Sequence, residues 1–499
     1  MLHLKTTDNN CSQKVSDLIK NSSHAGDSET FSAAHYFSLS RIANVPLKEL
    51  SGEKSNLLVF PYEIDKSYGA IGELPIFEMC GCCENLSEVK IKTGNLLGFV
   101  GVGSGDGAIQ LEISSRFSKS ENDFFLHYIL GKVFGENLFS LNYNASSGSV
   151  FDLLCFMFPL VLKNAVRQGI FKTYRTFERN DANVKGSLNI SRHIRQNIPF
   201  GGKVAYKERA QVFDNPFTEL VRHTIEFIKT KPFGKSILNS DSGTKSAVSQ
   251  IVELTQNYSF HERQKIISEN AKPVSHPFFT KWKPLQKLCL AILNHSKINY
   301  HSNEKSVCGL LFDGAWLWEE YLNTIFRPLG FEHPENKKHK GGLKMFANGD
   351  DELTFDKDFR RIYPDFYKKG EYVLDAKYKR LLNGVGREDL YQVVAYMHTM
   401  KIGRGGFIFP DDDTDFHKKT YCLANDAGTL DIIGVKIPQN AESLQEFCSL
   451  MKSEEKRKAS ALADAYFLYA DRRDAGPYKK AKNFTIQAFP RGGRGTALA

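Results

Sequence analysis

Two aspartates and a lysine lie close together in the stretch YPDFYKKGEYVLDAKYKRL, residues 363–381. Asp365 comes before a short segment that contains glycine, and Asp375 and Lys377 come after it, separated by one residue. Carboxylates are ligands that Mg²⁺ prefers, and a nearby ammonium group can orient water and offset charge that develops on a phosphate. The residue types and their spacing predict metal-assisted hydrolysis of a phosphodiester, with an ordinary solvated turn as the alternative.

A β-hairpin would bring these three side chains together. Side chains alternate along a strand, so Asp375 and Lys377 share one face of EYVLDAKY with a valine. With residues 369–371 as the loop and Gly370 in the left-handed conformation, Asp365 lies opposite Asp375 on the same face. Facing carboxylates repel each other unless a cation lies between them, which favours a metal site. The apolar side chains of this strand share the other face, which can cover a core: Tyr372, Leu374, Ala376 and Tyr378.

Two predicted helices flank the hairpin. In REDLYQVVAYMHTM, the polar residues Asp389, Gln392 and Tyr396 fall at i, i+3 and i+7 and form one stripe. Upstream, FDGAWLWEEYLNTIF reads as a helix that Asp313 caps, with Glu319 near its middle. A surface role for Gln392, Tyr396 and Glu319 is the alternative for each residue taken alone. The apolar side of the downstream helix holds Leu390, Val393, Val394 and Met397.

Positive charge is concentrated in one segment of the chain, whose formal net charge is +9. Residues 163–209 hold eleven lysines and arginines against three acidic residues. Such a segment is typical of a polyanion-binding surface, although a solvated face with its acids elsewhere in the fold would look the same. We select four candidate nucleic-acid contacts, three from this segment and one from the hairpin: Lys185, Arg192, Arg195 and Lys379.

The 499 residues predict a multidomain α+β protein with two to four domains. Short strand patterns with glycine turns precede residue 120, helical periodicity dominates the middle, and a mixed α/β pattern begins near residue 305. We therefore expect five segments: a loosely ordered polar extension at 1–50, a β-rich domain at 51–145, a helical basic region at 146–304, an α/β domain at 305–445, and a helix with a basic tail at 446–499.

No nucleotide-binding motif is present in the sequence. The stretch SGTKS at 242–246 lacks both glycines of the phosphate loop, and GVGSGDG at 101–107 does not match the dinucleotide pattern. Any nucleotide-driven motor must therefore come from another chain.

Composition and cysteine usage indicate a cytoplasmic protein. The nine cysteines are an odd number and mostly isolated, and CGCC at 80–83 lacks a second Cys/His pair at zinc-ligand spacing. The first residues show no apolar core of a secretory signal. The longest apolar run, residues 153–162, is about half a membrane span and contains Pro159, so we expect a buried helix and no membrane association.

The motif YPDF…VLDAKYK, followed by DLYQVVAY, resembles the PD-(D/E)xK nuclease fold with its Q-x-x-x-Y helix. More narrowly, it resembles McrC, the nuclease subunit of McrBC-type restriction systems. Residues 105–117, 169–197 and 310–322 are similar to other parts of that family, so the likeness extends in patches over residues 90–440. It implies a restriction-endonuclease-like domain at 305–445. The implied catalytic set is Asp365, Asp375, Lys377, Gln392, Tyr396 and Glu319.

The resemblance also implies a cofactor and partners. Mg²⁺, or Mn²⁺ in its place, would be held by Asp365, Asp375 and the backbone carbonyl of Ala376. McrC-like proteins work with McrB, a ring-forming AAA+ GTPase, so the domain at 51–145 would bind such a ring and the complex would cut double-stranded DNA in response to a modification. The chain departs from the family in FDGAW, where a Met-Asn usually follows the aspartate. Two alternatives remain: a non-cleaving DNA-binding subunit that activates the GTPase, and a stand-alone RecB-like repair nuclease.

Overall fold

The computed structural model describes residues 2–19, 30–50, 56–61, 69–103, 105–119, 123–134, 152–272, 278–298, 307–334, 341–345, 361–381, 384–412 and 418–474. The basic tail predicted at the end of the chain lies outside these residues. Within them, no helix is both long and apolar enough to cross a bilayer.

A five-stranded mixed sheet forms the N-terminal domain, in the order β1-β7-β6-β11-β3. β1 (Leu2–Thr7) is parallel to β7 (Ile109–Ser114), which is antiparallel to β6 (Leu96–Val102). β11 (Cys308–Asp313) lies between β6 and β3 (Asn56–Phe60) and is parallel to β3. A smaller sheet and two helices complete the domain: β2 (Gln13–Lys14), β5 (Lys90–Thr93), β4 (Phe77–Cys80), α1 (Ala33–Ser40) and α2 (Leu47–Leu50).

The sequence prediction was wrong at both ends of this domain. The polar start of the chain is not a loose extension, because β1 is an edge strand whose Leu2 and Leu4 are buried in the core. A strand buried on one face needs apolar residues only at alternate positions, so its composition looks polar. The α/β domain predicted from 305 does not begin there either, because the first described strand of that segment, β11, belongs to the N-terminal sheet. Leu310 and Leu311 of β11 face two different cores of the molecule.

Helices fill the middle of the chain, as the periodicity predicts. The apolar run around Pro159 lies within α5, and Phe158 and Leu162 on that helix are fully buried. The helices are α4 (Phe124–Phe134), α5 (Asp152–Val166), α7 (Pro216–Lys229), α8 (Gly234–Leu238), α9 (Ser242–Leu254), α10 (Arg263–Glu269) and α11 (Trp282–Ile298).

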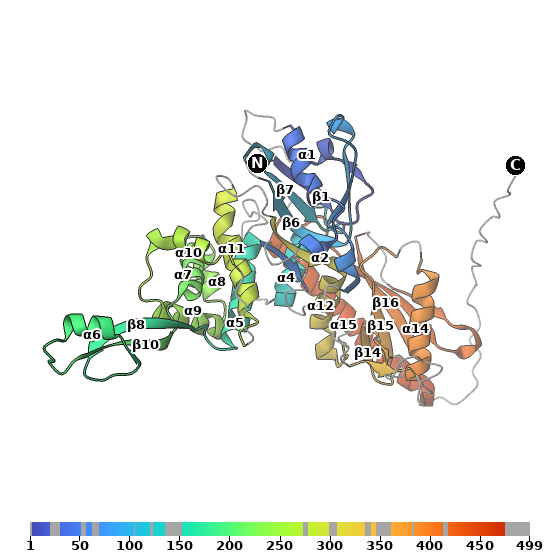
Figure 1. Cartoon of the computed structure of the whole chain (residues 1–499). Helices are drawn as coiled ribbons and strands as arrows, with labels where there is room; N and C mark the ends of the chain where they lie inside the picture. Colours follow the sequence, from blue (N-terminus) through green and yellow to red (C-terminus); the bar gives the residue numbers. More distant parts are fainter. Residues whose placement is uncertain are drawn as a thin grey trace, which may run out of the picture.

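The basic segment differs from the helical prediction, because most of it is a long β-arm. β8 (Thr173–Asp181) pairs along its full length with β10 (Val204–Val212), and β9 (Ser187–Leu188) and α6 (Ile190–Gln196) lie between them in sequence. We call residues 173–212 the arm. Figure 1 shows it protruding from the helical region, away from the C-terminal domain.

The C-terminal domain is built on a second mixed sheet, in the order β14-β15-β16-β18-β17. β14 (Phe366–Lys368) and β15 (Tyr372–Ala376) form an antiparallel hairpin. β15, β16 (Arg404–Asp411) and β18 (Thr429–Lys436) are parallel neighbours, and β17 (Lys418–Cys422) is an antiparallel edge. Two further short strands, β12 (Leu343–Lys344) and β13 (Arg361–Ile362), pair with each other.

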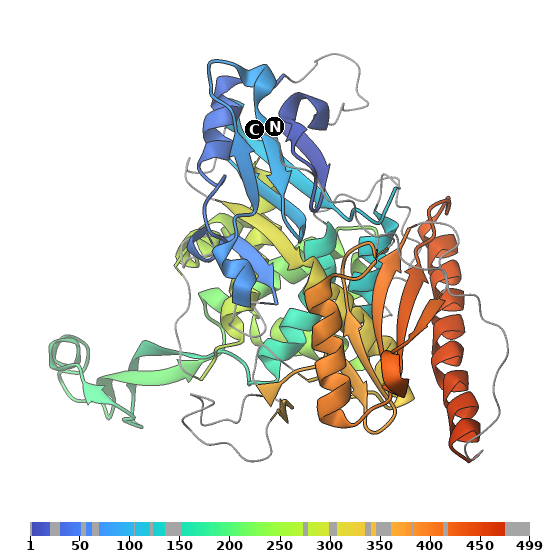
Figure 2. The ribbon, with the colours of Figure 1, turned by 90° about the vertical axis from the view of Figure 1, so that its right-hand side faces the viewer.

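Helices cover both faces of this sheet. α14 (Arg387–Met400) lies on one face, and α15 (Leu444–Asp474) lies on the other, as Figure 2 shows. α12 (Gly314–Phe326) belongs to the α15 side, where Leu374 of β15 is buried, whereas Val373 faces the α14 side. The two faces predicted for this strand are therefore confirmed, with both of them covered. α15 belongs to this core, so the boundary predicted at residue 446 falls inside a helix of the domain.

Candidate active site

The predicted hairpin is present with the predicted register. Phe366 faces Leu374 across β14 and β15, so Asp365, the preceding residue, comes opposite Asp375. Gly370 has a φ of +74° in the turn, a conformation that favours glycine. The three-residue loop therefore places both carboxylates at the same end of the hairpin.

The two carboxylates lie in an environment that disfavours their charge. Asp375 is 2% exposed, and burial raises its pKa, against the opposing effect of Lys377. Burial also raises the pKa of Asp365 to about 8, and repulsion by Asp375 adds to the effect. One oxygen of Asp365, Oδ2, accepts a 2.7 Å hydrogen bond from the backbone N–H of Ala376. A carboxyl pair with this electrostatic cost is relieved by a bound cation.

Lys377 lies between two acidic side chains. Its Nζ is 2.7 Å from Asp375 Oδ2 and 3.1 Å from Asp389 Oδ1. The first contact is an ion pair to a buried oxygen, Asp375 Oδ2. Burial by itself would lower the pKa of Lys377, but the two carboxylates hold it well above its ordinary range. Lys377 is therefore a fixed cation at neutral pH.

The downstream helix predicted from the sequence is α14, and its polar stripe faces the hairpin. Gln392 Nε2 donates a 2.7 Å hydrogen bond to Tyr396 Oη, and that hydroxyl lies 3.5 Å from the carbonyl oxygen of Tyr363. Burial raises the pKa of Tyr396, and the carboxylates of Asp365 and Asp375 add to the increase. The stripe and the hairpin therefore form one polar cluster.

Asp389 is the site residue that the sequence interpretation missed. It belongs to the recognised stripe, but no role was assigned to it, and its carboxylate contacts Lys377 and Lys379. Burial would raise its pKa, yet the hydrogen bonds from these lysines keep the pKa below its usual value. The helical spacing with Gln392 and Tyr396 was the signal that could have identified it.

The upstream helix contacts the site through a histidine. His333 Nδ1 donates a 2.5 Å hydrogen bond to the backbone carbonyl of Asp365, and its ring stacks on Phe366. His333 Nε2 lies 4.0 Å from Glu320 Oε1 on α12. This link involves Glu320, whereas a catalytic role for its half-buried neighbour Glu319 stays a prediction.

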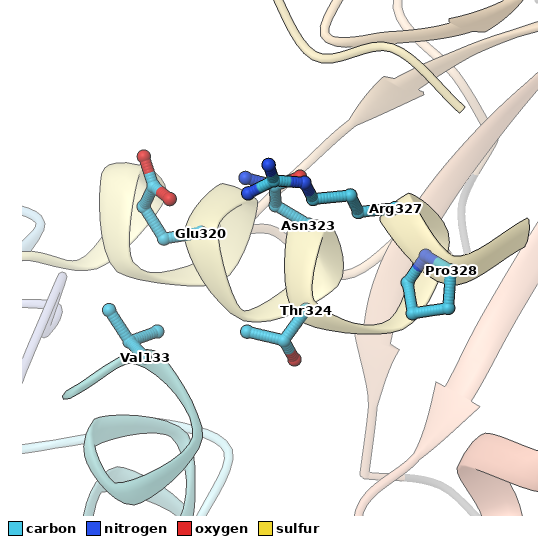
Figure 3. Close-up of a pocket in the computed structure, with 6 residues that line it drawn as sticks. All are labelled: Val133, Glu320, Asn323, Thr324, Arg327 and Pro328. Atoms are coloured by element: carbon cyan, nitrogen blue, oxygen red, sulfur yellow. The ribbon is translucent and has the colours of Figure 1, made fainter. Parts of the chain in front are cut away.

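A pocket lies along the same helix, but it is separate from the cluster. Figure 3 shows its lining, in which Glu320 is the single carboxylate, and neither Asp365 nor Asp375 nor Lys377 takes part. The lining residues are Val133, Glu320, Asn323, Thr324, Arg327 and Pro328.

The four candidate nucleic-acid contacts fall in two places. Lys379 adjoins the cluster, with Nζ 2.6 Å from Asp389 Oδ2. Lys185, Arg192 and Arg195 lie on the arm, where Lys185 and Arg195 are exposed. DNA contact by either group stays a prediction.

The donor set suits a hard divalent cation. Asp375 supplies a buried carboxylate, one oxygen of which pairs with Lys377, and Asp365 uses one oxygen toward Ala376 and has a second. Mg²⁺ needs oxygen ligands and keeps several waters, so two carboxylates suffice. The predicted third ligand, the Ala376 carbonyl, stays a prediction. Among the described residues, no group of three or more histidine, cysteine or acidic side chains has the geometry of a metal site.

One known protein family matches the part of the chain that contains most of these elements. The family model for the McrBC 5-methylcytosine restriction system component matches residues 91–410, which is more than half of the chain. The chain belongs to this family. The matched residues include the arm, the hairpin and α14, so the family pattern covers the whole polar cluster.

Two solved assemblies are similar to this McrBC family member. One is a refined half-complex from a tetradecameric assembly of Thermococcus gammatolerans McrB AAA+ hexamers with bound McrC, at 14% identity and a TM-score of 0.46, covering 90% of this chain and 99% of that one. The other is the cryo-EM structure of the Thermococcus gammatolerans McrBC complex, at 14% identity and a TM-score of 0.32, covering 65% and 87%. No curated protein sequence matches the chain.

Proposed function

We propose that this protein is the Mg²⁺-dependent DNA endonuclease subunit of a modification-dependent restriction complex, with a PD-(D/E)xK nuclease domain at its C-terminus. The observation that carries the proposal is the convergence of Asp365, Asp375 and Lys377 at one end of the hairpin, beside the polar stripe of α14. A divalent ion bound there would polarise a phosphodiester and acidify water.

The charge of each side chain determines its proposed role in the reaction. Asp365 and Asp375 hold the ion, and the backbone N–H of Ala376 fixes the orientation of Asp365. Lys377 stays protonated, so it donates hydrogen bonds to water or to a phosphate oxygen and offsets negative charge, but it does not accept a proton as a base. Asp389 holds the lysine from the far side.

Gln392 and Tyr396 act as a supporting pair. Their mutual hydrogen bond and the contact with the Tyr363 carbonyl tie α14 to the residues that lead into β14. The Gln392 side chain is exposed, so it would also be able to contact a DNA backbone near the cluster.

The partner in this proposal is a ring-forming AAA+ GTPase of the McrB type, because the sequence holds no phosphate loop and one of the similar assemblies contains McrB AAA+ hexamers with bound McrC. The arm is the surface that we assign to it or to DNA. Eight of the seventeen large hydrophobic side chains exposed in the described residues lie on or directly beside the arm, and exposed apolar surface of this extent favours a protein partner. They are Tyr174, Val184, Leu188, Ile190, Ile194, Ile198, Phe200 and Phe213.

Replacement of the site lysine tests the catalytic part of the proposal. Lys377→Ala should lower the rate of plasmid cleavage, measured with Mg²⁺, GTP and the partner GTPase, by about 1000-fold or more, because charge stabilisation at a reacting group is lost. Partner binding and GTP hydrolysis should persist. Lys369→Ala, an exposed lysine in the loop of the same hairpin, is the matched control and should cut at the normal rate.

Two results would count against nuclease function. Cutting by Lys377→Ala at the rate of the unmodified protein would end the assignment of the site. Absence of cleavage by the unmodified protein in Mg²⁺ and Mn²⁺, with intact stimulation of GTP hydrolysis, would favour the non-cleaving regulatory subunit.

A further inference from the structure

The residue that follows the proposed catalytic lysine is held by a different domain. The backbone N–H of Lys377 makes the last sheet hydrogen bond, 2.8 Å to the carbonyl of Ile408, and the chain then leaves the sheet. Tyr378 comes next, and its side chain is buried against residues 115–117 of the N-terminal domain. The lysine therefore lies between an anchor in its own sheet and an anchor in another domain.

Arg116 is the centre of the second anchor. Its guanidinium Nη2 donates a short hydrogen bond to the backbone carbonyl of Tyr378, and the same group lies 4.8 Å from the centre of the Tyr378 ring. The Arg116 side chain is only 10% exposed. A guanidinium can make several such contacts at once because its donors form a rigid planar fork.

The N-terminal domain in turn fixes Arg116. The backbone N–H of Arg116 donates a 2.6 Å hydrogen bond to Asp8 Oδ1, and Arg116 Nη1 lies 3.6 Å from Asp8 Oδ2. Arg116 Nη1 also donates to Asn95 Oδ1 at 3.3 Å. Asp8 follows β1 and is fully buried, so the arginine is held by the sheet of its own domain.

The side chain of Tyr378 is enclosed by residues on two sides. Its hydroxyl lies 2.9 Å from Ser115 Oγ, and its ring meets that of Phe117 edge to face at 5.1 Å. On the other side, a Cβ added to Gly314 would come within 2.7 Å of the tyrosine ring, so only glycine fits at the start of α12. The ring therefore has little freedom to move.

Arg116 is far from the carboxylates in sequence, yet its contact with Tyr378 lies one residue from Lys377. We propose that Arg116 is a positioning residue for the cleavage centre: it holds the Tyr378 carbonyl and thereby fixes Lys377 relative to Asp375. This inference rests on the proposed nuclease function for its consequence in catalysis. It makes correct seating of the N-terminal domain a condition for the active geometry.

Chemical labelling of the full-length protein tests the geometry without any need for cleavage. A short pulse of acetic anhydride, read out by peptide mass spectrometry, reports how accessible and how firmly held each lysine is. In Arg116→Met, Lys377 should be acetylated about tenfold faster, because its backbone is released on one side. Lys369, which is exposed in the loop of the hairpin and nine residues from Tyr378, should change little and serves as an internal standard.

A second variant, Arg116→Lys, distinguishes loss of positioning from loss of folding. It keeps a positive charge near the buried Asp8, so the melting temperature should stay close to that of the unmodified chain, but one ammonium cannot reproduce the bridging fork. Lys377 labelling should still increase. Lys92→Met is the matched control, since it removes an exposed cation of the same domain that pairs with Glu78.

Cleavage with the partner GTPase supplies the second measurement. The single-turnover rate of Arg116→Lys should fall about 10- to 100-fold, with unchanged DNA affinity in Ca²⁺, because small displacements of a catalytic group cost this much. Unchanged Lys377 labelling in a folded Arg116→Lys or Arg116→Met protein would overturn the inference, whatever the cleavage rate. Failure of the unmodified protein to cut would instead contradict the proposed function and leave the labelling result to decide the role of Arg116.

Discussion

At the scale of single residues, the site combines two carboxylates that repel each other with a lysine that is attracted to both Asp375 and Asp389. Asp365 and Asp375 face each other, and their partial or full removal from water raises the pKa of both. Lys377 and Asp389 extend the cluster as a cation and an anion in contact. In the proposed function, a proton and a metal ion would therefore compete for the carboxyl pair near neutral pH.

Metal affinity should consequently depend on pH. With a pKa of about 8, Asp365 is protonated below that pH, and a bound ion must displace the proton. The Mn²⁺ affinity measured by calorimetry should rise between pH 6 and pH 8, by up to about tenfold per unit. Asp365→Asn should bind more weakly and lose most of this dependence. Equal affinity of the unmodified protein at pH 6 and pH 8 would contradict the protonation of this carboxyl.

At the scale of secondary structure, the position of α14 on the sheet decides whether its polar stripe reaches the hairpin. Gly405 of β16 permits the close approach: an added Cβ would lie 2.6 Å from Met397 Sδ and 2.8 Å from Val393 Cγ1. Those two residues form the buried side of α14. A glycine in the strand therefore determines how near Asp389, on the next face of the helix, comes to Lys377.

Gly405→Ala should displace α14. The overpacking should destabilise the domain by about 1–3 kcal/mol, seen as a lower melting temperature, and should reduce cleavage by moving Asp389 and the Gln392–Tyr396 pair. Gly94→Ala is a suitable control, because an added Cβ there meets nothing within 4 Å. A Gly405→Ala protein with the melting temperature and cleavage rate of the unmodified chain would show that this packing does not position the site.

At the scale of the whole molecule, the arm and the polar cluster occupy different parts of the structure, as Figure 1 shows. The arm has a small three-stranded sheet, one short helix and many exposed apolar side chains, so its own fold buries few of these side chains. The N-terminal sheet lies next to the C-terminal domain through Arg116 and Tyr378. The proposed function therefore uses separate surfaces of one chain, the arm for contact with the partner or DNA and the polar cluster for cutting DNA.

Polar replacement on the arm should separate these activities. The double variant Ile194→Ser with Phe200→Ser changes two exposed side chains, so the melting temperature and Mn²⁺ binding should stay unchanged. Co-elution with the partner GTPase in gel filtration, and stimulation of GTP hydrolysis, should fall at least about tenfold, as expected for apolar anchors of an interface. Phe37→Ser, an exposed aromatic residue on α1, is the control. Full stimulation by the double variant would place the partner surface elsewhere.

The local part of the site could be predicted from the sequence alone. Alternation along one strand, a glycine in a three-residue loop and helical spacing on α14 are short-range rules, and they correctly paired Asp365 with Asp375 and grouped Gln392 with Tyr396. These features depend on backbone geometry over a few residues, so no knowledge of the rest of the fold was needed.

Only the tertiary structure decided which distant segments meet. β1 from the start of the chain and β11 from beyond its midpoint join one sheet, and Arg116 reaches Tyr378 across 262 positions. The role of Asp389 also depended on how closely α14 approaches β16. Such contacts arise from burial of apolar surface and from the need to pair buried polar groups, which depend on the whole fold and leave no periodic pattern in the sequence.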